Sequence, residues 1–277
     1  MNWGIIGTGN MGNVLLHALT SSQAVPQKNM YLYNRTFMKA YTLKENYPDV
    51  HVVQTVETLA KDCDIILLCA KPKQIVEIAK KIKPIVKPEQ FVVSITSSVS
   101  VENLDSILPC SVARMIPSIT NRALSGVTLL TFPEGYDQDK KEVLLQSCKL
   151  FSTPVEIEEQ HVRIASDIVS CGPAFLSFLL EDMIQAAQQK TGIPKDQATT
   201  LVEQMIIGFG KLFEDNIYNF TSLKEKVMVK GGITGEGMKA LEQSYNDIFT
   251  DVFNATHNKF YHEKDNIDEL VNQINVK

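Results

Sequence analysis

A glycine-rich turn near the start of the chain is the feature best suited to chemistry. Residues 7–12 read GTGNMG, which matches the pattern GxGxxG, and they lie between an apolar stretch (2–6) and an apolar-periodic stretch (14–19). A strand, a glycine turn and a helix in this order form the dinucleotide-binding fingerprint, because the turn and the free N–H groups of the helix hold phosphates. The expected phosphate-binding residues are Gly7, Thr8, Gly9, Asn10, Met11 and Gly12.

Each glycine of this turn has its own expected task. Gly7 permits the tight turn, Gly9 lets the backbone approach a pyrophosphate, and Gly12 lets the helix pack closely on the strand. A glycine-rich turn without a ligand is the alternative, but the flanking strand and helix favour a nucleotide site.

The end of the second expected strand, residues 30–33, indicates which nucleotide binds. Asn34, Arg35 and Thr36 follow this strand, and the first acidic residue of the chain is Glu45. A site for NAD usually places a carboxylate at this strand end to bind the ribose 2′-hydroxyl. The planar guanidinium of Arg35 suits a 2′-phosphate instead, and Asn34 and Thr36 add neutral donors. The sequence therefore predicts NADP, with an ordinary surface arginine as the alternative for Arg35.

Composition excludes several other classes of protein. The 277 residues carry a net charge of −5, which argues against nucleic-acid binding because such proteins need a basic face. We find no long uncharged apolar run, so we expect no membrane span. The N-terminus has no basic region before its apolar segment, so a signal peptide is not expected. Five cysteines are scattered singly, which favours a reducing cytoplasm without disulfides or a metal site.

The first 158 residues alternate between strand-like and helix-like patterns. This alternation predicts a mostly parallel, doubly wound sheet with helices on both faces, so residues 1–158 are expected to form a Rossmann-type domain of the α/β class. The expected strands cover residues 2–6, 30–33, 50–53, 64–69, 91–95, 111–115, 127–132 and 154–157.

From residue 159 onwards the strand-like patterns stop, so residues 159–277 are expected to form an all-helical domain. Gly172 and Pro173 predict a break between the first two helices. Apolar stripes at helical spacing indicate a core, and their number suggests a subunit interface as well. The expected helices cover residues 161–170, 173–190, 195–214, 223–229, 234–262 and 265–271.

The whole chain resembles the pyrroline-5-carboxylate reductase family. The resemblance is carried by GTGNMG, by Asn34-Arg35-Thr36, and by Ala70, Lys71 and Pro72 after the strand-like residues 64–69. It implies that Ala70-Lys71-Pro72 lies beside the nicotinamide end of NADPH. A solvated residue before a helix is the less favoured alternative for Lys71. It also implies a homodimer or higher oligomer, because family members interlock their C-terminal helices.

Two substrate-side motifs of the family are altered here. The motif RxMPNTP reads RMIPSIT in residues 114–120, which retain Arg114 and Pro117, and we expect Pro117 to contact the cofactor as in the family. The motif SGSGPAY reads VSCGPAF in residues 169–175, where only Gly-Pro-Ala remains.

The substrate loop of the family, SPGG[TA]T, reads VKGGIT in residues 229–234. In relatives this loop clamps the substrate carboxylate, so Gly231, Gly232, Ile233 and Thr234 are the expected substrate-binding residues. Val229 removes a serine donor, whereas Lys230 could replace the lost contact with its charge or could be a surface lysine. The pattern GGITGEG is similar to the late-competence-operon branch of the family.

The implied reaction is hydride transfer from NADPH to the carbon of a cyclic imine, with a proton reaching its nitrogen. Thr234 is the matched hydrogen-bond donor to the ring nitrogen or the carboxylate, and a helix N-cap is its alternative role. Lys230 and Asp167 are the other catalytic candidates. Asp167 could supply a proton if burial keeps it protonated, and a solvated helix residue is the alternative.

Two functions therefore stay open. One is an NADPH-dependent reductase that converts pyrroline-5-carboxylate to proline or acts on a related cyclic imine. The other is a dinucleotide-binding member of the same family that has lost or narrowed catalysis and acts in regulation of competence or development. A hydroxyacid dehydrogenase is least favoured, because no catalytic lysine motif is evident.

Overall fold

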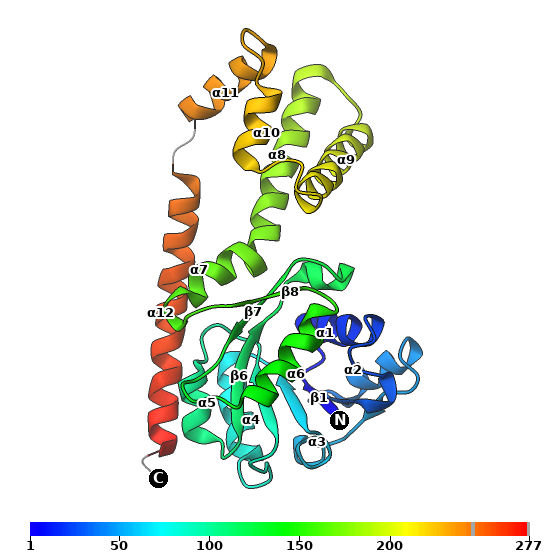
Figure 1. The fold of residues 1–277 in the computed structure, drawn as a ribbon, viewed down its shortest axis with the longest axis vertical. Coiled ribbons are helices and arrows are strands. Elements are labelled where there is room, and N and C mark those ends of the chain that lie inside the picture. The colour runs from blue at the N-terminus through cyan, green and yellow to red at the C-terminus, as the bar shows by residue number, and fades with distance from the viewer. Residues whose placement is uncertain (245–246, 276–277) are drawn as a thin grey trace. The chain divides into compact units, whose positions relative to one another are not determined.

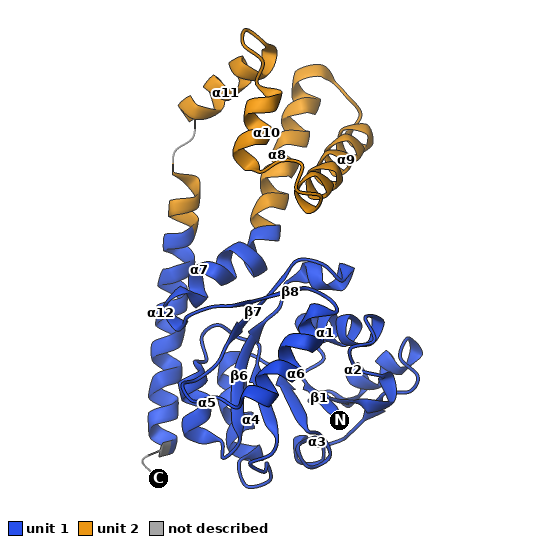
Figure 2. Cartoon of the chain, in the orientation of Figure 1, with its two compact units in different colours: residues 1–173, 253–277 blue, residues 174–252 orange. Residues whose placement is uncertain are grey.

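The computed structural model describes residues 1–244 and 247–275. These residues form two compact units, of which the first comprises residues 1–173 and 253–277 and the second residues 174–252 (Figure 2). The first unit holds the sheet, and each unit is described by itself below. The division differs from a boundary at residue 158, because the C-terminal segment returns to the first unit.

The first unit contains one eight-stranded sheet with the order β3-β2-β1-β4-β5-β6-β7-β8 (Figure 1). All neighbouring strands pair in parallel except β6 and β7, which are antiparallel. The strands are β1 (Trp3–Ile6), β2 (Met30–Tyr33), β3 (His51–Val52), β4 (Ile65–Leu68), β5 (Phe91–Ser94), β6 (Ser111–Ile116), β7 (Val127–Thr131) and β8 (Thr153–Glu156). The strand order reverses between β1 and β4, which is where such sheets bind ligands.

Helices cover both faces of this sheet, which confirms the predicted doubly wound Rossmann-type architecture. Leu15 and Leu16 of α1 pack in a cluster on one face, and Leu59 of α3 and Ile75 of α4 pack on the other. The helices between the strands are α1 (Asn10–Ser21), α2 (Phe37–Tyr41), α3 (Val56–Asp62), α4 (Pro72–Ile82), α5 (Val101–Ile107) and α6 (Gln138–Lys149).

The helices after residue 159 differ from the prediction at Gly172 and Pro173. The α-helix α7 (Val162–Ser166) continues through a π-helical segment (Asp167–Cys171) into α8 (Gly172–Thr191), so the predicted break is wrong. Proline lacks an N–H group and its ring clashes with the carbonyl four residues earlier. A π-helical turn widens the helix directly before Pro173, and this geometry accommodates the proline.

The helical run 159–191 passes a membrane-span test of length and composition, which core helices of soluble proteins also pass, so it does not overturn the expectation that nothing spans a membrane. It contains a window of mean hydropathy 1.4, and the run is long and apolar enough to cross a membrane by length and composition alone. Only 11% of that window is buried, and the exposed apolar side chains in α8 include Leu176, Phe178 and Met183.

Beyond α8 the described residues form helices joined by turns, and no strand occurs in residues 174–244 or 247–275. The helices are α9 (Lys195–Glu214), α10 (Phe220–Val227), α11 (Ile233–Ser244) and α12 (Ile248–Asn275). The predicted separate helix over residues 265–271 is wrong, because these residues belong to α12. Ile267 and Val271 are buried against the sheet cluster that contains Leu104. Burial of such a side chain contributes about 1.5–3 kcal/mol, which holds α12 on the first unit.

Candidate active site

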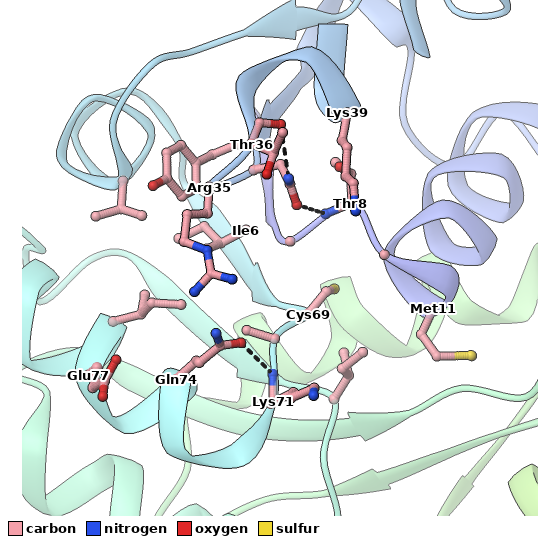
Figure 3. A pocket seen from close by; sticks show the side chains of 18 of the residues that line it. Ile6, Thr8, Met11, Arg35, Thr36, Lys39, Cys69, Lys71, Gln74 and Glu77 are labelled. Carbon is pink, nitrogen blue, oxygen red and sulfur yellow. Dashed lines mark hydrogen bonds between the residues drawn. The ribbon is translucent and has the colours of Figure 1, made fainter. Parts of the chain in front are cut away.

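A cavity of about 790 Å³ lies at the carboxyl ends of β1, β2 and β4 (Figure 3). It combines three segments that are far apart in the sequence: the glycine turn, the end of β2 and the start of α4. The cavity is lined by ten of the predicted cofactor residues, namely Gly7, Thr8, Gly9, Asn10, Met11, Asn34, Arg35, Thr36, Ala70 and Lys71.

The glycine turn needs glycine for different reasons at its three positions. Gly7 has φ +104°, and a Cβ atom there would lie 2.3 Å from the Cys69 carbonyl oxygen. A Cβ atom on Gly12 would lie 2.0 Å from the Gly7 carbonyl oxygen, so α1 packs directly on the turn. A Cβ atom on Gly9 would meet no protein atom within 4 Å. Because Gly9 lines the cavity, its missing side chain leaves room for a ligand rather than for the protein.

Hydrogen bonds of Asn34 hold the glycine turn in place, and one polar group of the turn, on Thr8, has no protein partner in the described part of the chain. The Thr8 backbone N–H donates to Asn34 Oδ1 at 3.3 Å, and Asn34 Nδ2 donates to the Thr36 carbonyl at 3.0 Å. The Thr8 hydroxyl is buried and has no partner among the described residues. A buried polar group without a partner is costly, so the hydroxyl is suited to a ligand that enters the cavity. The residues present therefore fit a dinucleotide.

The end of β2 carries positive charge and no carboxylate. Arg35 is exposed, lines the cavity, and forms no ion pair with any residue that the structure describes. Sequence reasoning missed Lys39, which also lines the cavity and lies four residues after Arg35. In Figure 3 the Lys39 side chain extends towards Thr8, whereas the Arg35 guanidinium points towards Gln74 and Glu77. This charge pattern fits the 2′-phosphate of NADP.

One face of α4 forms another part of the cavity that sequence reasoning missed. Gln74, Glu77, Ile78 and Lys81 line the cavity, and their spacing of three to four residues places them on one helix face. That periodicity could have identified them once Pro72 was placed at the first turn of a helix. The Gln74 side chain also accepts a hydrogen bond from the Lys71 N–H at 3.4 Å, which fixes the start of α4.

Three further predicted or neighbouring residues lie at the edges of this arrangement. Pro72 begins α4 but does not itself line the cavity. Pro117 is buried away from it, and its carbonyl accepts a hydrogen bond from the Ser170 hydroxyl at 2.5 Å. Cys69 does line the cavity, but burial raises the pKa of its thiol well above the usual range. A thiol of this kind is a poor nucleophile.

The two altered substrate-side motifs lie against each other. The Ser118 hydroxyl donates to the Val169 carbonyl at 2.8 Å, and the Ser170 hydroxyl donates to the Pro117 carbonyl. Residues 118, 169 and 170 are among the positions where this chain departs from the family patterns. The hydroxyl groups of Ser118 and Ser170 therefore fasten the loop after β6 to the π-helical segment.

Arg114 is retained from the family motif but is completely buried. It forms an ion pair with Glu159, whose side chain is 35% exposed, and donates from Nη1 to the Ser97 and Val99 carbonyls at 3.2 Å each. These contacts attach the start of the helical region to the loop after β5. The guanidinium of Arg114 is thus engaged by protein groups and has a structural role.

Asp167 is buried, with a fully covered side chain, so the solvated alternative is wrong. Arg163 donates to both of its oxygens, and the Thr256 hydroxyl donates to Oδ2 at 2.8 Å. The carboxylate serves as a hydrogen-bond acceptor for the protein and does not line the cofactor cavity. The structure therefore does not favour Asp167 as a proton donor.

The predicted substrate loop lies in the second unit, whereas Asp167 and the cofactor cavity lie in the first. Gly231 has φ +74°, and the Gly232 N–H donates to the Val229 carbonyl at 2.8 Å, so residues 229–232 form a turn before α11. Lys230 and Thr234 are exposed, and Ile233 is 94% exposed. Because α11 begins at Ile233, Thr234 lies inside the first turn and the N-cap alternative is wrong.

Comparisons with known proteins match both parts of the chain. The family model for pyrroline-5-carboxylate reductase dimerisation matches residues 159–262, and the model for NADP oxidoreductase, coenzyme F420-dependent, matches residues 2–98. ComE operon protein 4 of Bacillus subtilis (strain 168) is 43% identical over 94% of this chain and 95% of that protein.

More distant relatives match over nearly the whole length of the chain. Pyrroline-5-carboxylate reductase 3 of Bacillus subtilis (strain 168) is 29% identical over 93% of this chain and 94% of that protein. A crystal structure of Plasmodium falciparum pyrroline carboxylate reductase with NADP bound has the same fold, with a TM-score of 0.81 and 23% identity over 95% of this chain and 97% of that chain. The chain belongs to the pyrroline-5-carboxylate reductase family, in the branch of ComE operon protein 4.

Proposed function

We propose that this protein is an NADPH-dependent reductase of pyrroline-5-carboxylate, or of a related cyclic imine. The observation that carries the proposal is the cofactor cavity. Its glycine turn is open at Gly9, it contains the unpartnered hydroxyl of Thr8, and it carries Arg35 where an NAD site would carry a carboxylate.

The chain's own residues would act mainly by binding and orienting. The glycine turn and the start of α1 hold the pyrophosphate through backbone N–H groups, and Arg35 pairs with the 2′-phosphate. The cofactor, when bound, supplies the hydride. Ala70, Lys71 and Thr96 border the cavity at the ends of β4 and β5, where they would position the nicotinamide and limit access of water.

The substrate would bind through residues 230–234. The backbone N–H groups of Gly231 and Ile233, which are free among the described residues, would hold the carboxylate beside Gly232, whose own N–H already donates to the Val229 carbonyl. The charge of Lys230 would add to this contact because Val229 lacks a hydroxyl. The Thr234 hydroxyl would donate a hydrogen bond to the ring nitrogen or to the carboxylate. In this scheme residues 1–158 bind the cofactor, and residues 159–277 bind the substrate and dimerise.

Homodimerisation would cover the exposed apolar side chains of the second unit. Leu176 and Phe178 of α8 and Leu201 and Ile207 of α9 are exposed, and the matched family model describes dimerisation. A dimer interface accounts for the apolar run 159–191 without a membrane. All five cysteines are free, which supports a cytoplasmic location, and the acidic net charge gives no support for a nucleic-acid partner.

A second candidate function is dinucleotide binding in regulation with little catalysis. It is favoured by Val229, by the altered motifs at residues 118 and 169–170, and by the relative named ComE operon protein 4. The cofactor half is the same in both candidates, so only turnover separates them.

The deciding experiment measures NADPH oxidation by the purified chain with pyrroline-5-carboxylate over a range of concentrations, with proline quantified as product. A reductase consumes NADPH and forms proline in equal amounts. A regulatory protein binds NADPH with ordinary affinity but forms no proline above the level without protein. Other cyclic imines, with and without a carboxylate, would identify the substrate class.

A further inference from the structure

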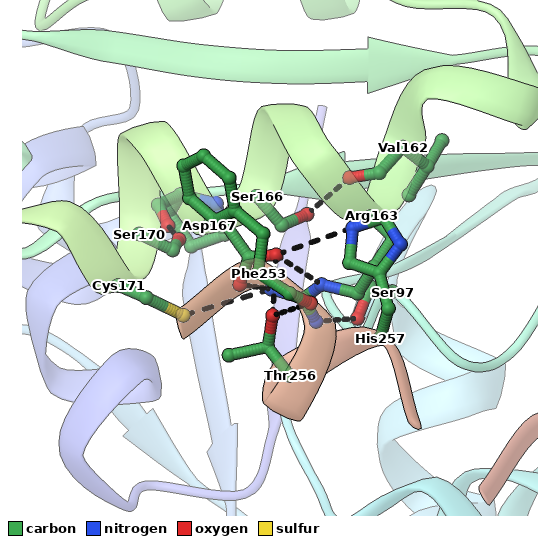
Figure 4. Close-up of polar contacts among 11 residues, drawn as sticks. Ser97, Val162, Arg163, Ser166, Asp167, Ser170, Cys171, Phe253, Thr256 and His257 are labelled. Atoms are coloured by element: carbon green, nitrogen blue, oxygen red, sulfur yellow. Dashed lines mark hydrogen bonds and ion pairs between the residues drawn. The ribbon is translucent and has the colours of Figure 1, made fainter. Parts of the chain in front are cut away.

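A cluster of charged and polar side chains lies in the first unit outside the cofactor cavity (Figure 4). Its centre is the carboxylate of Asp167, in the π-helical segment. Arg163 Nη2 donates to Asp167 Oδ1 at 2.7 Å, and Arg163 Nε donates to Asp167 Oδ2 at 3.3 Å. A bidentate ion pair between a guanidinium and a carboxylate is among the stronger and more directional contacts in proteins.

The same carboxylate also holds α12. The Thr256 hydroxyl donates to Asp167 Oδ2 at 2.8 Å, and His257 Nε2 lies 3.5 Å from that oxygen. The chain leaves the first unit after Pro173 and returns to it at Phe253. Asp167 therefore joins the outgoing segment to the returning segment within the first unit.

Arg163 extends this cluster to the cofactor cavity. Its Nη1 donates to the Ser97 hydroxyl at 3.1 Å, and the neighbouring residues Ile95 and Thr96 line the cavity. The Ser97 carbonyl is held in addition by Arg114. The loop after β5, residues 95–99, is thus fastened by two buried or largely buried arginines.

The position of this loop decides which end of the cofactor it would affect. Arg35, at the end of β2, marks the end of the cavity that suits the 2′-phosphate, so the ends of β4 and β5 are left for the nicotinamide. A shift of loop 95–99 would disturb the nicotinamide end and leave the adenosine end unchanged. Loss of an ion pair that only stabilises the fold would instead affect binding of both ends of the cofactor equally.

We propose that Asp167 is a positioning residue which, through Arg163 and Ser97, holds loop 95–99 at the nicotinamide end of the cofactor cavity and makes that position depend on the docking of α12. The proposal rests on the proposed binding of NADPH in this cavity. Under this proposal Asp167 does not donate a proton but fixes the position of loop 95–99.

The test compares two ligands by calorimetry: NADPH, and 2′,5′-ADP, which has the 2′-phosphate but no nicotinamide. Asp167→Asn and Ser97→Ala are each expected to weaken NADPH binding by roughly 2- to 30-fold, the range of residues that act through a contact network. Binding of 2′,5′-ADP should stay within about two-fold. The double variant should lose little more than either single variant, because both break the same connection.

Asp268→Asn is the matched control. Asp268 also holds α12, because it accepts a hydrogen bond from Asn103 Nδ2 of α5 at 2.8 Å. Its pair with Lys264 lies within α12, and it has no hydrogen bond or ion pair with loop 95–99 among the described residues. This variant should bind both ligands normally. An equal loss for NADPH and 2′,5′-ADP, additive losses, or an equal effect of Asp268→Asn would overturn the positioning role.

Two safeguards keep the test decisive. If Asp167→Asn does not fold, Ser97→Ala still decides, because it removes one hydroxyl and leaves the pair between Arg163 and Asp167 intact. Failure of the unmodified chain to bind NADPH would overturn the proposed function and with it this role. Normal NADPH binding without a response in Ser97→Ala would overturn only the positioning role.

Discussion

Replacement of Arg35 by alanine should remove most of the preference for NADPH over NADH. Arg35 lines the cofactor cavity and has no ion pair with any described residue, so its guanidinium is free to meet a 2′-phosphate. A hydrogen bond to a charged group contributes about 1.5–3 kcal/mol. Because Arg35 is exposed, solvent screens the contact and the lower part of this range applies.

The expected loss for NADPH is therefore on the order of 10-fold, since about 1.4 kcal/mol corresponds to one decade. NADH lacks the 2′-phosphate, so its dissociation constant should change by less than about two-fold. Both constants can be measured by the fluorescence of the reduced nicotinamide. Lys80→Ala is a suitable control, because Lys80 is exposed on α4 and does not line the cavity.

Two outcomes would refute this reasoning. Equal dissociation constants for NADPH and NADH in the unmodified protein would mean that the end of β2 does not recognise the 2′-phosphate. A normal preference in Arg35→Ala would instead assign recognition to another group, of which Lys39 is the nearest along the chain.

Three further predictions follow from the geometry. Gly9→Ala should fold normally but bind NADPH poorly, whereas Gly12→Ala should also lower the melting temperature, because its Cβ would lie 2.0 Å from the Gly7 carbonyl oxygen; equal melting temperatures would contradict the packing argument. Glu159→Gln should lower the free energy of unfolding in urea by roughly 3 kcal/mol, because it leaves the charge of Arg114 buried; a change below about 0.5 kcal/mol, the usual size of a surface substitution, would contradict it. Restoration of the family loop at residues 229, 230 and 233 (to Ser, Pro and Thr) should raise proline formation about ten- to hundred-fold, the equivalent of one charged hydrogen bond, and unchanged turnover would show that the loop does not limit the reaction.

The sheet and the cofactor cavity were predictable because local sequence carries both. Strands such as β2 (Met30–Tyr33) are short apolar runs between polar residues. The spacing of the three glycines is typical of a strand–turn–helix unit that binds a dinucleotide. The family motifs then identified the residues at the ends of β2 and β4. These features depend on neighbours within a few residues.

The helical half was harder to predict because its determinants are distant in sequence. Gly172 and Pro173 predict a break, but the π-helical turn before them keeps the helix continuous. Residues 265–271 looked like a separate helix, and their extension into α12 depends on packing of Ile267 against α5 and the sheet. The burial of Asp167 depends on Thr256, 89 residues away. A pattern of neighbouring residues cannot predict a contact between residues so far apart in the sequence.

The measurement that tests the central claim most directly follows the hydride itself. The purified protein would be incubated with pyrroline-5-carboxylate and NADPH carrying deuterium in the transferred position at C4 of the nicotinamide, and the product would be analysed by mass spectrometry. An NADPH-dependent reductase yields proline that is heavier by one deuterium, located at C5. Tight NADPH binding without deuterated proline would contradict the reductase function and favour a regulatory dinucleotide-binding protein.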